Sequence, residues 1–182
     1  ATEAAVQANI AAAGYSTSTP FTPGAKVSLQ ATTSCCTGDY LKHDTSDDNV
    51  VIAPVTSTSS ATDKGNATWI VRAGLADSSC VSFESANTPG SYLRHYAFQL
   101  HLQPNDGSSQ FAPDATFCPT SGNSGTGYSL RSFNYPSFHY PAKYIRHYSF
   151  TGYIASDGGT NTWDTASMWT QDTSWLAASP WS

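Results

Sequence analysis

Three related segments recur at a regular interval along this 182-residue chain. They are GDYLKH from Gly38, GSYLRHY from Gly90 and AKYIRHY from Ala142. Their histidines, His43, His95 and His147, are spaced 52 residues apart. A strand-like segment opens each unit and an aromatic-ended tetrapeptide (NATW, DATF or DTSW) follows each histidine. Internal repeats of this kind indicate units that cannot bury their apolar faces alone and must pack on one another.

Each repeat unit contains several short runs with alternating apolar and polar residues, separated by Gly, Asn, Asp and Pro. Such runs predict strands of about 4–6 residues. Three units of four short strands predict an all-β fold, the β-trefoil, which closes a small barrel and so limits exposed strand edges. We place the units at about 27–80, 81–127 and 128–182. A solenoid is disfavoured, because there are only three units and none resembles a polar cap.

The first 25 residues differ in composition from the repeats. An Ala-rich stretch, ATEAAVQANIAAAGY, predicts a weak helix, and a Ser/Thr/Pro-rich linker, STSTPFTPG, follows it at 16–24. We therefore expect a tail or linker over residues 1–25, which includes the short helix, and a single β-trefoil domain over 26–182.

Composition narrows the classes of partner. The net charge is −5 and only 8 residues are Lys or Arg, which argues against a nucleic-acid partner. Charged residues make up 12% of the chain, about half the usual share. The sequence has no run of about 18 apolar residues, so we expect no membrane span.

The four cysteines point to an oxidising compartment, because none has the C-x-x-C spacing of a metal site. We favour a Cys80–Cys118 disulfide, which leaves Cys35 and Cys36 to bond each other or to stay reduced. In the alternative pairing, Cys35 and Cys36 each bond a separate partner. Asn66 begins an N-glycosylation sequon. These features predict a secreted, extracellular glycoprotein.

The repeated histidine and the acidic residue of the following tetrapeptide suit a sugar site. We expect His95 to meet Asp114 in the second unit, and His147 to meet Asp172 in the third. An ionised carboxylate accepts hydrogen bonds from neighbouring hydroxyls, and such charge-assisted bonds are strong. Four tyrosines would supply flat apolar faces with a polar edge: Tyr92, Tyr96, Tyr144 and Tyr148.

The same residues also permit a purely structural interpretation, in which the histidine bonds a backbone carbonyl and the aspartate caps a turn. The first unit favours the binding interpretation. It keeps His43 and the aromatic Trp69 but replaces the aspartate with Asn66, the arginine with Lys42 and the following tyrosine with Asp44. We therefore treat His43 and Asn66 as a degenerate first site.

Catalytic and metal sites are poorly supported by the sequence. Common glycosidases need two carboxylates facing one bond, yet Glu occurs only at Glu3 and Glu84. Asp106, Asp157 and Asp164 lie in turn-like segments, and His101 and His139 have no counterpart in the other units. There is no G-x-S-x-G elbow and no H-E-x-x-H motif. We expect no catalytic residue, metal or cofactor in this chain.

Long strings of the sequence resemble a known family. CVSFESANTPGSYLRHYAFQL, DGSSQFAPDATFC and KYIRHYSFTGYIASDGG resemble, in order, the arabinose-binding module of carbohydrate-binding module family 42. That module is the C-terminal β-trefoil of fungal family 54 α-L-arabinofuranosidases. The resemblance covers about residues 25–178, and the segment before it resembles the end of the catalytic domain, which is itself absent.

The resemblance implies a function and a set of residues. It implies a non-catalytic module that binds arabinofuranosyl side chains of arabinoxylan or arabinan and targets a glycoside hydrolase to hemicellulose. Its partners would be that polysaccharide and the catalytic domain of the same parent enzyme, and we expect a monomer. It implies binding by His95 with Asp114 and by His147 with Asp172, a degenerate first repeat, and the Cys80–Cys118 disulfide.

One segment departs from the family pattern. Residues 137–142, SFHYPA, form an extra stretch just before the third histidine motif. We expect it to add an aromatic platform to the third pocket or to block it in part.

Two other classes of function remain open from the sequence. The chain could retain α-L-arabinofuranosidase activity, or it could be a protein-binding trefoil similar to a protease inhibitor. The symmetric recurrence of the distinctive residues favours the sugar-binding module, because such inhibitors tend to present one exposed loop.

Overall fold

The computed structural model of the chain describes residues 19–136 and 141–182. Its strands are β1 (Lys26–Ala31), β2 (Asp39–His43), β3 (Val50–Pro54), β4 (Trp69–Ala73), β5 (Val81–Ser85), β6 (Ser91–Tyr96), β7 (Gln99–Pro104), β8 (Phe117–Ser121), β9 (Tyr128–Ser132), β10 (Tyr144–Tyr148), β11 (Thr151–Ala155) and β12 (Trp175–Ala178). The short helices are η2 (Ser34–Cys36), α2 (Ala61–Asn66), α3 (Phe111–Asp114), η3 (Thr162–Asp164) and α4 (Trp169–Asp172). The helix expected in the first residues lies outside the described part of the chain.

Six strands close into a barrel. The first and fourth strands of each unit pair antiparallel in the cyclic order β1, β4, β5, β8, β9, β12 and back to β1. The contact between β1 and β12 includes Ser28 opposite Ala178, so the two ends of the domain meet in one ladder. Closing the ring in this way pairs strand edges that would otherwise be exposed.

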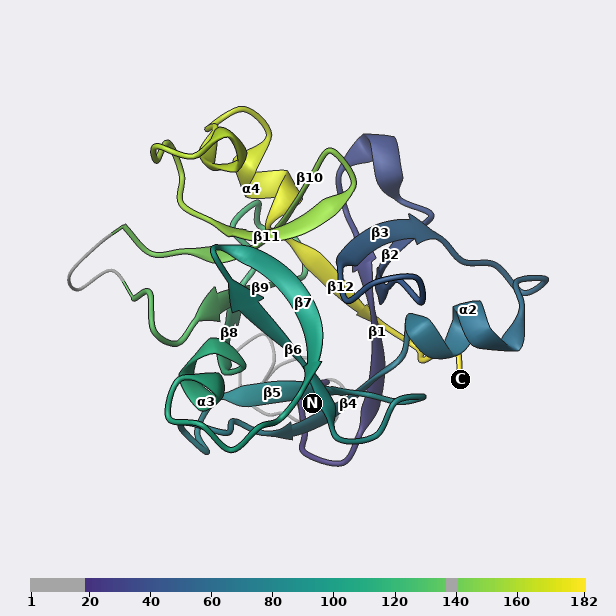
Figure 1. The fold of residues 1–182 in the computed structure, drawn as a ribbon. Helices are drawn as coiled ribbons and strands as arrows, with labels where there is room; N and C mark the ends of the chain where they lie inside the picture. Colours follow the sequence, from purple (N-terminus) through teal and green to yellow (C-terminus); the bar gives the residue numbers. More distant parts are fainter. Residues whose placement is uncertain (1–18, 137–140) are drawn as a thin grey trace, which may run out of the picture.

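The remaining six strands form three hairpins, β2–β3, β6–β7 and β10–β11. The hairpins also pair with one another, because β11 contacts both β3 and β7, and a bridge joins Asn49 to His101. The helices α2, α3 and α4 lie around the outside of this arrangement, one to each unit (Figure 1). A barrel of six strands with three interlocking hairpins is the predicted β-trefoil.

The core repeats with the units. Equivalent positions on the first strand, the hairpin and the last strand of each unit are 0% exposed, and they are Leu29, Phe83 and Leu130; Leu41, Leu93 and Ile145; and Trp69, Phe117 and Trp175. The two tryptophans also satisfy their indole N–H groups, by donating to the carbonyls of Leu41 and Ile145. Each unit thus contributes the same three layers, which explains why no unit can be stable alone.

The tetrapeptide in each unit is a turn from a short helix into the barrel. In the second unit the Thr116 hydroxyl donates to the Ala112 carbonyl at 2.8 Å, and Phe117 then enters the core. The Ser82 hydroxyl donates to the Ala115 carbonyl at 2.6 Å, which ties the turn to strand β5. The other two units make equivalent bonds. These bonds hold Asp114 and its counterparts at the last residue of each short helix.

The packed domain begins before the predicted boundary at residue 26. Phe21 is buried, and its ring lies 6.0 Å from that of Phe83 and 5.2 Å from that of Tyr128. Part of the expected tail therefore seals one side of the barrel.

Both disulfides join pairs that the sequence analysis considered. Cys80 bonds Cys118, as favoured, and Cys35 bonds its neighbour Cys36. No described cysteine is free.

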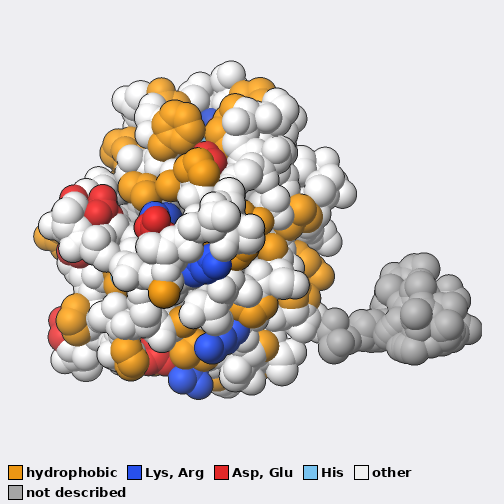
Figure 2. Space-filling view, turned by 90° about the vertical axis from the view of Figure 1, so that its right-hand side faces the viewer, with side chains coloured by type: hydrophobic (Ala, Val, Ile, Leu, Met, Phe, Trp, Pro, Cys, Tyr) orange, Lys and Arg blue, Asp and Glu red, His pale blue; other side chains and the backbone are white. Residues whose placement is uncertain are grey.

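On the face drawn in Figure 2, charged side chains are scattered among uncharged polar surface. No helix of the described residues is long and apolar enough to cross a membrane.

Removing the Cys80–Cys118 bridge, by changing both residues to Ala, should lower the free energy of unfolding by about 3–4 kcal/mol, because the bridge constrains the unfolded chain over 38 residues. Urea unfolding followed by tryptophan fluorescence measures this. The variant Cys35→Ala/Cys36→Ala is the control, and it should lose less, because a bridge between neighbours closes almost no loop. Equal losses in the two variants would contradict the prediction.

Candidate functional site

Each unit of the trefoil has one cavity beside its repeated histidine. The cavities of the first, second and third units have volumes of about 240, 220 and 260 Å³ and are lined by His43, His95 and His147, respectively. Each histidine ends or nearly ends the first strand of its hairpin, and Asn66, Asp114 or Asp172 faces it from the end of a short helix. We call these the first, second and third pockets.

The second pocket brings together the predicted pair. Nε2 of His95 lies 3.7 Å from Oδ1 of Asp114, and both residues are only 4% exposed. The same nitrogen lies 2.8 Å from Oδ1 of Asn134, whose amide group donates to Asp114 at 2.8 Å. Because that Asn134 oxygen can only accept, His95 carries its proton on Nε2. Asn134 therefore links the imidazole to the carboxylate.

In the second and third pockets, the arginine that precedes the histidine binds the carboxylate. Nη2 of Arg94 lies 2.5 Å from Oδ2 of Asp114, and Nη2 of Arg146 lies 2.9 Å from Oδ2 of Asp172. Arg146 is 1% exposed and also donates to three backbone carbonyls. Burying a carboxylate is costly unless it is paired, so the arginine is what allows the aspartate to stand in the pocket as an anion. The sequence analysis noticed this arginine in the repeat but gave it no role.

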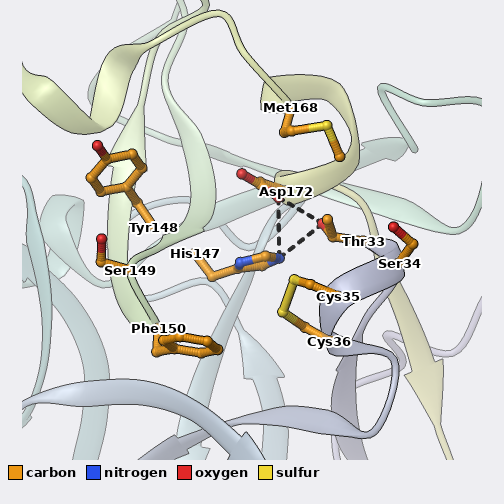
Figure 3. A pocket seen from close by; sticks show the side chains of 10 residues that line it. All are labelled: Thr33, Ser34, Cys35, Cys36, His147, Tyr148, Ser149, Phe150, Met168 and Asp172. Carbon is orange, nitrogen blue, oxygen red and sulfur yellow. Dashed lines mark hydrogen bonds and ion pairs between the residues drawn. A yellow bond between two sulfur atoms is a disulfide. The ribbon is translucent and has the colours of Figure 1, made fainter.

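The third pocket has the same plan with different partners. Nε2 of His147 lies 3.5 Å from Oδ1 of Asp172 (Figure 3). The Thr33 hydroxyl links them: it donates to Asp172 at 2.6 Å and lies 3.1 Å from Nε2 of His147. Thr33 thus replaces Asn134 of the second pocket.

The two pockets differ in the acceptor capacity left on the carboxylate. Oδ1 of Asp114 accepts from Asn134 and from the Gln110 amide at 3.0 Å. Met168 lines the third pocket at the place that Gln110 takes in the second, just before the short helix, and it cannot donate to Asp172. A carboxylate oxygen accepts about two hydrogen bonds. The third pocket therefore has the more available acceptor.

Each pocket is completed by the unit that follows it. Ser132 and Asn134, which bond His95, belong to the third unit, and Ser85 and Asn87, which bond His43, belong to the second. Thr33 of the first unit completes the third pocket. The signal for these residues was present in the sequence, because VSFESAN, YSLRSFN and VSLQATT align Asn87, Asn134 and Thr33.

Two of the four predicted tyrosines line the pockets. Tyr96 lines the second pocket and Tyr148 the third. Tyr92 and Tyr144 do not line either cavity; their rings pack against Phe111 and Trp169 at centroid distances of 6.4 and 5.6 Å. Residues three apart in a strand point to opposite faces, which turns Tyr92 and Tyr144 away from the side of His95 and His147. Their expected role as sugar contacts stays a prediction.

Other aromatic walls come from residues that the sequence analysis did not single out. Phe98 and Tyr135 line the second pocket, with ring centroids 5.4 Å apart. Phe150 lines the third, where it is 59% exposed. Phe98 and Phe150 both have positive φ angles in the tight hairpin turns that follow Tyr96 and Tyr148.

The first pocket has an amide, Asn66, where the other two pockets have the aspartate that meets the histidine. Asn66 is 3% exposed, and its Oδ1 accepts from Asn87 at 2.7 Å. Lys42, at the place of the arginine, instead pairs with Asp63 at 2.8 Å. Asn66 was also expected to carry a glycan, and because its side chain is buried, a glycan on its Nδ2 would require the surrounding residues to move.

The extra stretch at 137–142 was expected beside the third pocket. Residues 137–140, with His139, lie outside the described part of the chain. The residues just before them, Asn134 and Tyr135, line the second pocket and not the third. Because residues 137–140 are not described, the expected effect of this stretch on the third pocket stays a prediction. His101 lies apart from the pockets, 3.0 Å from Asp48.

Burial lowers the pKa of the pocket histidines. Desolvation lowers the pKa of His95 below its ordinary value, and the nearby Arg94 acts in the same direction, while Asp114 and the Asn134 hydrogen bond oppose the shift. Desolvation likewise lowers the pKa of His147, against the charge of Asp172. Both imidazoles are therefore neutral near pH 7 in the folded chain.

This shift predicts lower stability in acid. A histidine whose pKa is lowered by folding is protonated more readily in the unfolded chain, so stability falls as pH drops from about 6.5 toward the lowered pKa. We expect the free energy of unfolding to decline between pH 7.5 and pH 5, measured by urea titration. The decline should be smaller in His95→Gln/His147→Gln, and an unchanged decline in that variant would contradict the assignment.

Comparison with known proteins supplies the family. The family model described as the alpha-L-arabinofuranosidase B (ABFB) domain matches residues 29–177. A probable alpha-L-arabinofuranosidase B of Aspergillus clavatus is 50% identical over 98% of this chain and 35% of its own length. An alpha-L-arabinofuranosidase of Hypocrea jecorina is 48% identical over 98% of this chain and 35% of its own length. The chain thus spans about a third of these relatives.

Comparison with solved structures indicates the same family. A GH54 α-L-arabinofuranosidase soaked with a cyclic sulfate inhibitor aligns with a TM-score of 0.84 at 45% identity, over 100% of this chain and 37% of that one. An arabinofuranosidase complexed with arabinofuranosyl-alpha-1,2-xylobiose aligns with a TM-score of 0.83 at 44% identity, over 99% and 37%. A cytolethal distending toxin, at 14% identity and a TM-score of 0.57, shares the fold alone. By family model, sequence and structure, this chain belongs to the alpha-L-arabinofuranosidase B (ABFB) domain family.

Proposed function

We propose that this chain is a non-catalytic carbohydrate-binding module that holds arabinofuranosyl side chains of arabinoxylan or arabinan in its second and third pockets. The observation that carries the proposal is the pairing, in these two pockets only, of a neutral imidazole with an arginine-anchored carboxylate. Membership of the family supports the choice of arabinose as the sugar.

The pocket chemistry suits a neutral sugar. In the third pocket the carboxylate oxygen on the histidine side has capacity for a hydrogen bond from a ring hydroxyl, and in the second pocket a ring hydroxyl would take the place of the Gln110 amide on Asp114. Charge assistance strengthens these bonds. The aromatic walls, Phe98 with Tyr135 in one pocket and Phe150 in the other, offer flat faces to the sugar C–H groups. Each pocket is the size of a single sugar ring rather than of a long chain, which favours a side-chain or terminal residue as the ligand.

The same geometry argues against glycoside hydrolysis in these pockets. Hydrolysis in most families needs two carboxylates flanking one bond. The residues that line the second and third pockets include one carboxylate each, Asp114 and Asp172, and each is already neutralised by an arginine. The hydrolytic activity named for the relatives is expected to lie in the part of those proteins that this chain does not cover.

Two pockets on one rigid domain would act together on a polymer. A single shallow sugar site with a Kd of about 1 mM corresponds to only about −4 kcal/mol. Two such sites raise retention by avidity where the spacing of the polymer's side chains allows both to be filled. We infer that the module keeps a linked catalytic domain at hemicellulose outside the cell, and the two disulfides are consistent with such an oxidising location.

Replacing the pocket aspartates tests the proposal. Asp114→Asn and Asp172→Asn should each weaken retention on an arabinoxylan affinity gel, by about 10- to 150-fold in Kd, because each loses a charge-assisted bond worth about 1.5–3 kcal/mol. The double variant should not be retained. Asp63→Asn, in the first pocket, is the matched control and should bind as the unmodified chain does. A folded double variant that is retained normally would refute the pocket assignment, with circular dichroism as the check on folding.

A chromogenic arabinofuranoside tests the catalytic alternative. We expect the purified chain to release no chromophore above the rate in buffer. Turnover that is lost in Asp114→Asn or Asp172→Asn would show instead that these carboxylates are catalytic.

A further inference from the structure

One wall of the third pocket is a disulfide between neighbouring residues. Cys35 and Cys36 both line the cavity, together with His147, Phe150 and Met168. Figure 3 shows the sulfur–sulfur bond turned toward His147, with Phe150 and Met168 on either side of the pocket. The wall that a ligand meets here is therefore sulfur and hydrocarbon.

The repeat shows what this wall replaces. Aligning Asn134 with Thr33 sets Tyr135 against Ser34, next to the cysteines. In the second pocket Tyr135 supplies the aromatic wall beside Phe98. In the third pocket the short helix η2 (Ser34–Cys36) has no aromatic residue, and the disulfide lies where that wall would be. A disulfide is apolar and polarisable, so it can take over the packing role of the ring.

The disulfide also adjoins the residue that organises the pocket's polar group. Thr33 precedes η2 directly, and its carbonyl accepts from the Cys36 N–H at 2.9 Å. The Thr33 hydroxyl is the group that joins His147 to Asp172. A bridge between adjacent residues stiffens the backbone of this turn, and so it helps to hold the Thr33 hydroxyl in place.

The two ends of the bridge differ in access. Cys35 is exposed, while Cys36 is 3% exposed and packs in the hydrophobic core. The other bridge, between Cys80 and Cys118, is buried at both ends, at 9% and 8% exposed. A soluble reductant can therefore reach the pocket disulfide more easily than the other one.

We propose that the Cys35–Cys36 disulfide is a ligand-contacting wall of the third pocket and a positioning element for Thr33, so that opening it weakens sugar binding in this pocket and leaves the second pocket unchanged. This rests on the proposed function. The bridge opens when a phosphine reductant supplies two electrons: the S–S bond breaks, water supplies two protons to the two sulfurs, and the phosphine takes up the oxygen of that water to become the phosphine oxide. The third pocket then loses its apolar wall and its fixed turn.

Two single-pocket backgrounds separate the effects. Asp114→Asn leaves the third pocket, and Asp172→Asn leaves the second. Methyl α-L-arabinofuranoside is titrated into each background by NMR, with and without Cys35→Ser/Cys36→Ser. We expect the cysteine change to weaken binding by about 10-fold in the Asp114→Asn background, from the lost apolar contact, and by less than about 2-fold in the Asp172→Asn background.

Other outcomes have distinct meanings. Unchanged binding in the third-pocket background would overturn this proposal and leave the proposed function standing. Equal weakening in both backgrounds would also overturn it, because the bridge would then act on the whole fold. An unmodified chain that binds no arabinofuranoside would overturn the proposed function, and this proposal with it.

Reduction of the unmodified chain gives a second measurement. Under a limiting phosphine reductant, alkylation followed by mass spectrometry should label Cys35 and Cys36 before Cys80 and Cys118. Chemical-shift changes at His147 on sugar addition should shrink in parallel with that labelling, while those at His95 persist. Loss of both sets of shifts together would contradict the proposal.

Discussion

The buried ion pair between arginine and aspartate is the interaction on which both complete pockets depend. Asp114 and Asp172 are buried at the last residue of their short helices, and a buried carboxylate without a partner is costly. The guanidinium groups of Arg94 and Arg146 compensate by direct bonds. Because the arginine binds Oδ2 of each carboxylate, Oδ1 is the oxygen that lies nearer the histidine. In the first unit Asn66 stands in place of the aspartate, and the cation that precedes the histidine, Lys42, pairs instead with Asp63.

Much of this arrangement could be read from the repeat. The spacing of His43, His95 and His147, with a short strand before and an aromatic tetrapeptide after, was enough to predict the trefoil and the meeting of each histidine with its carboxylate. The prediction worked because identical units in a closed ring occupy equivalent environments. The disulfide between Cys80 and Cys118 was also favoured, with the family resemblance in its support, and it is present.

The remaining pocket residues could not be predicted from the sequence of a single repeat unit. Asn134 and Thr33 reach the pockets from the neighbouring unit, and a motif search confined to each repeat misses them. Tyr92 and Tyr144 were assigned to the pockets because they recur three residues before the histidines. An odd spacing in a strand points side chains to opposite faces, and their rings pack against Phe111 and Trp169. The adjacent bond between Cys35 and Cys36 was one of three possibilities, and spacing does not choose among them.

Each pocket includes residues from the neighbouring unit, and this affects when each pocket can form during folding. The third pocket needs Thr33, near the start of the domain, and Asp172, near its end, and these come together only where β1 and β12 close the barrel. The second pocket can be assembled from residues between His95 and Asn134 plus their immediate surroundings. The third pocket therefore forms only when the ring closes, and sugar binding there would report that the first and last strands of the domain have paired.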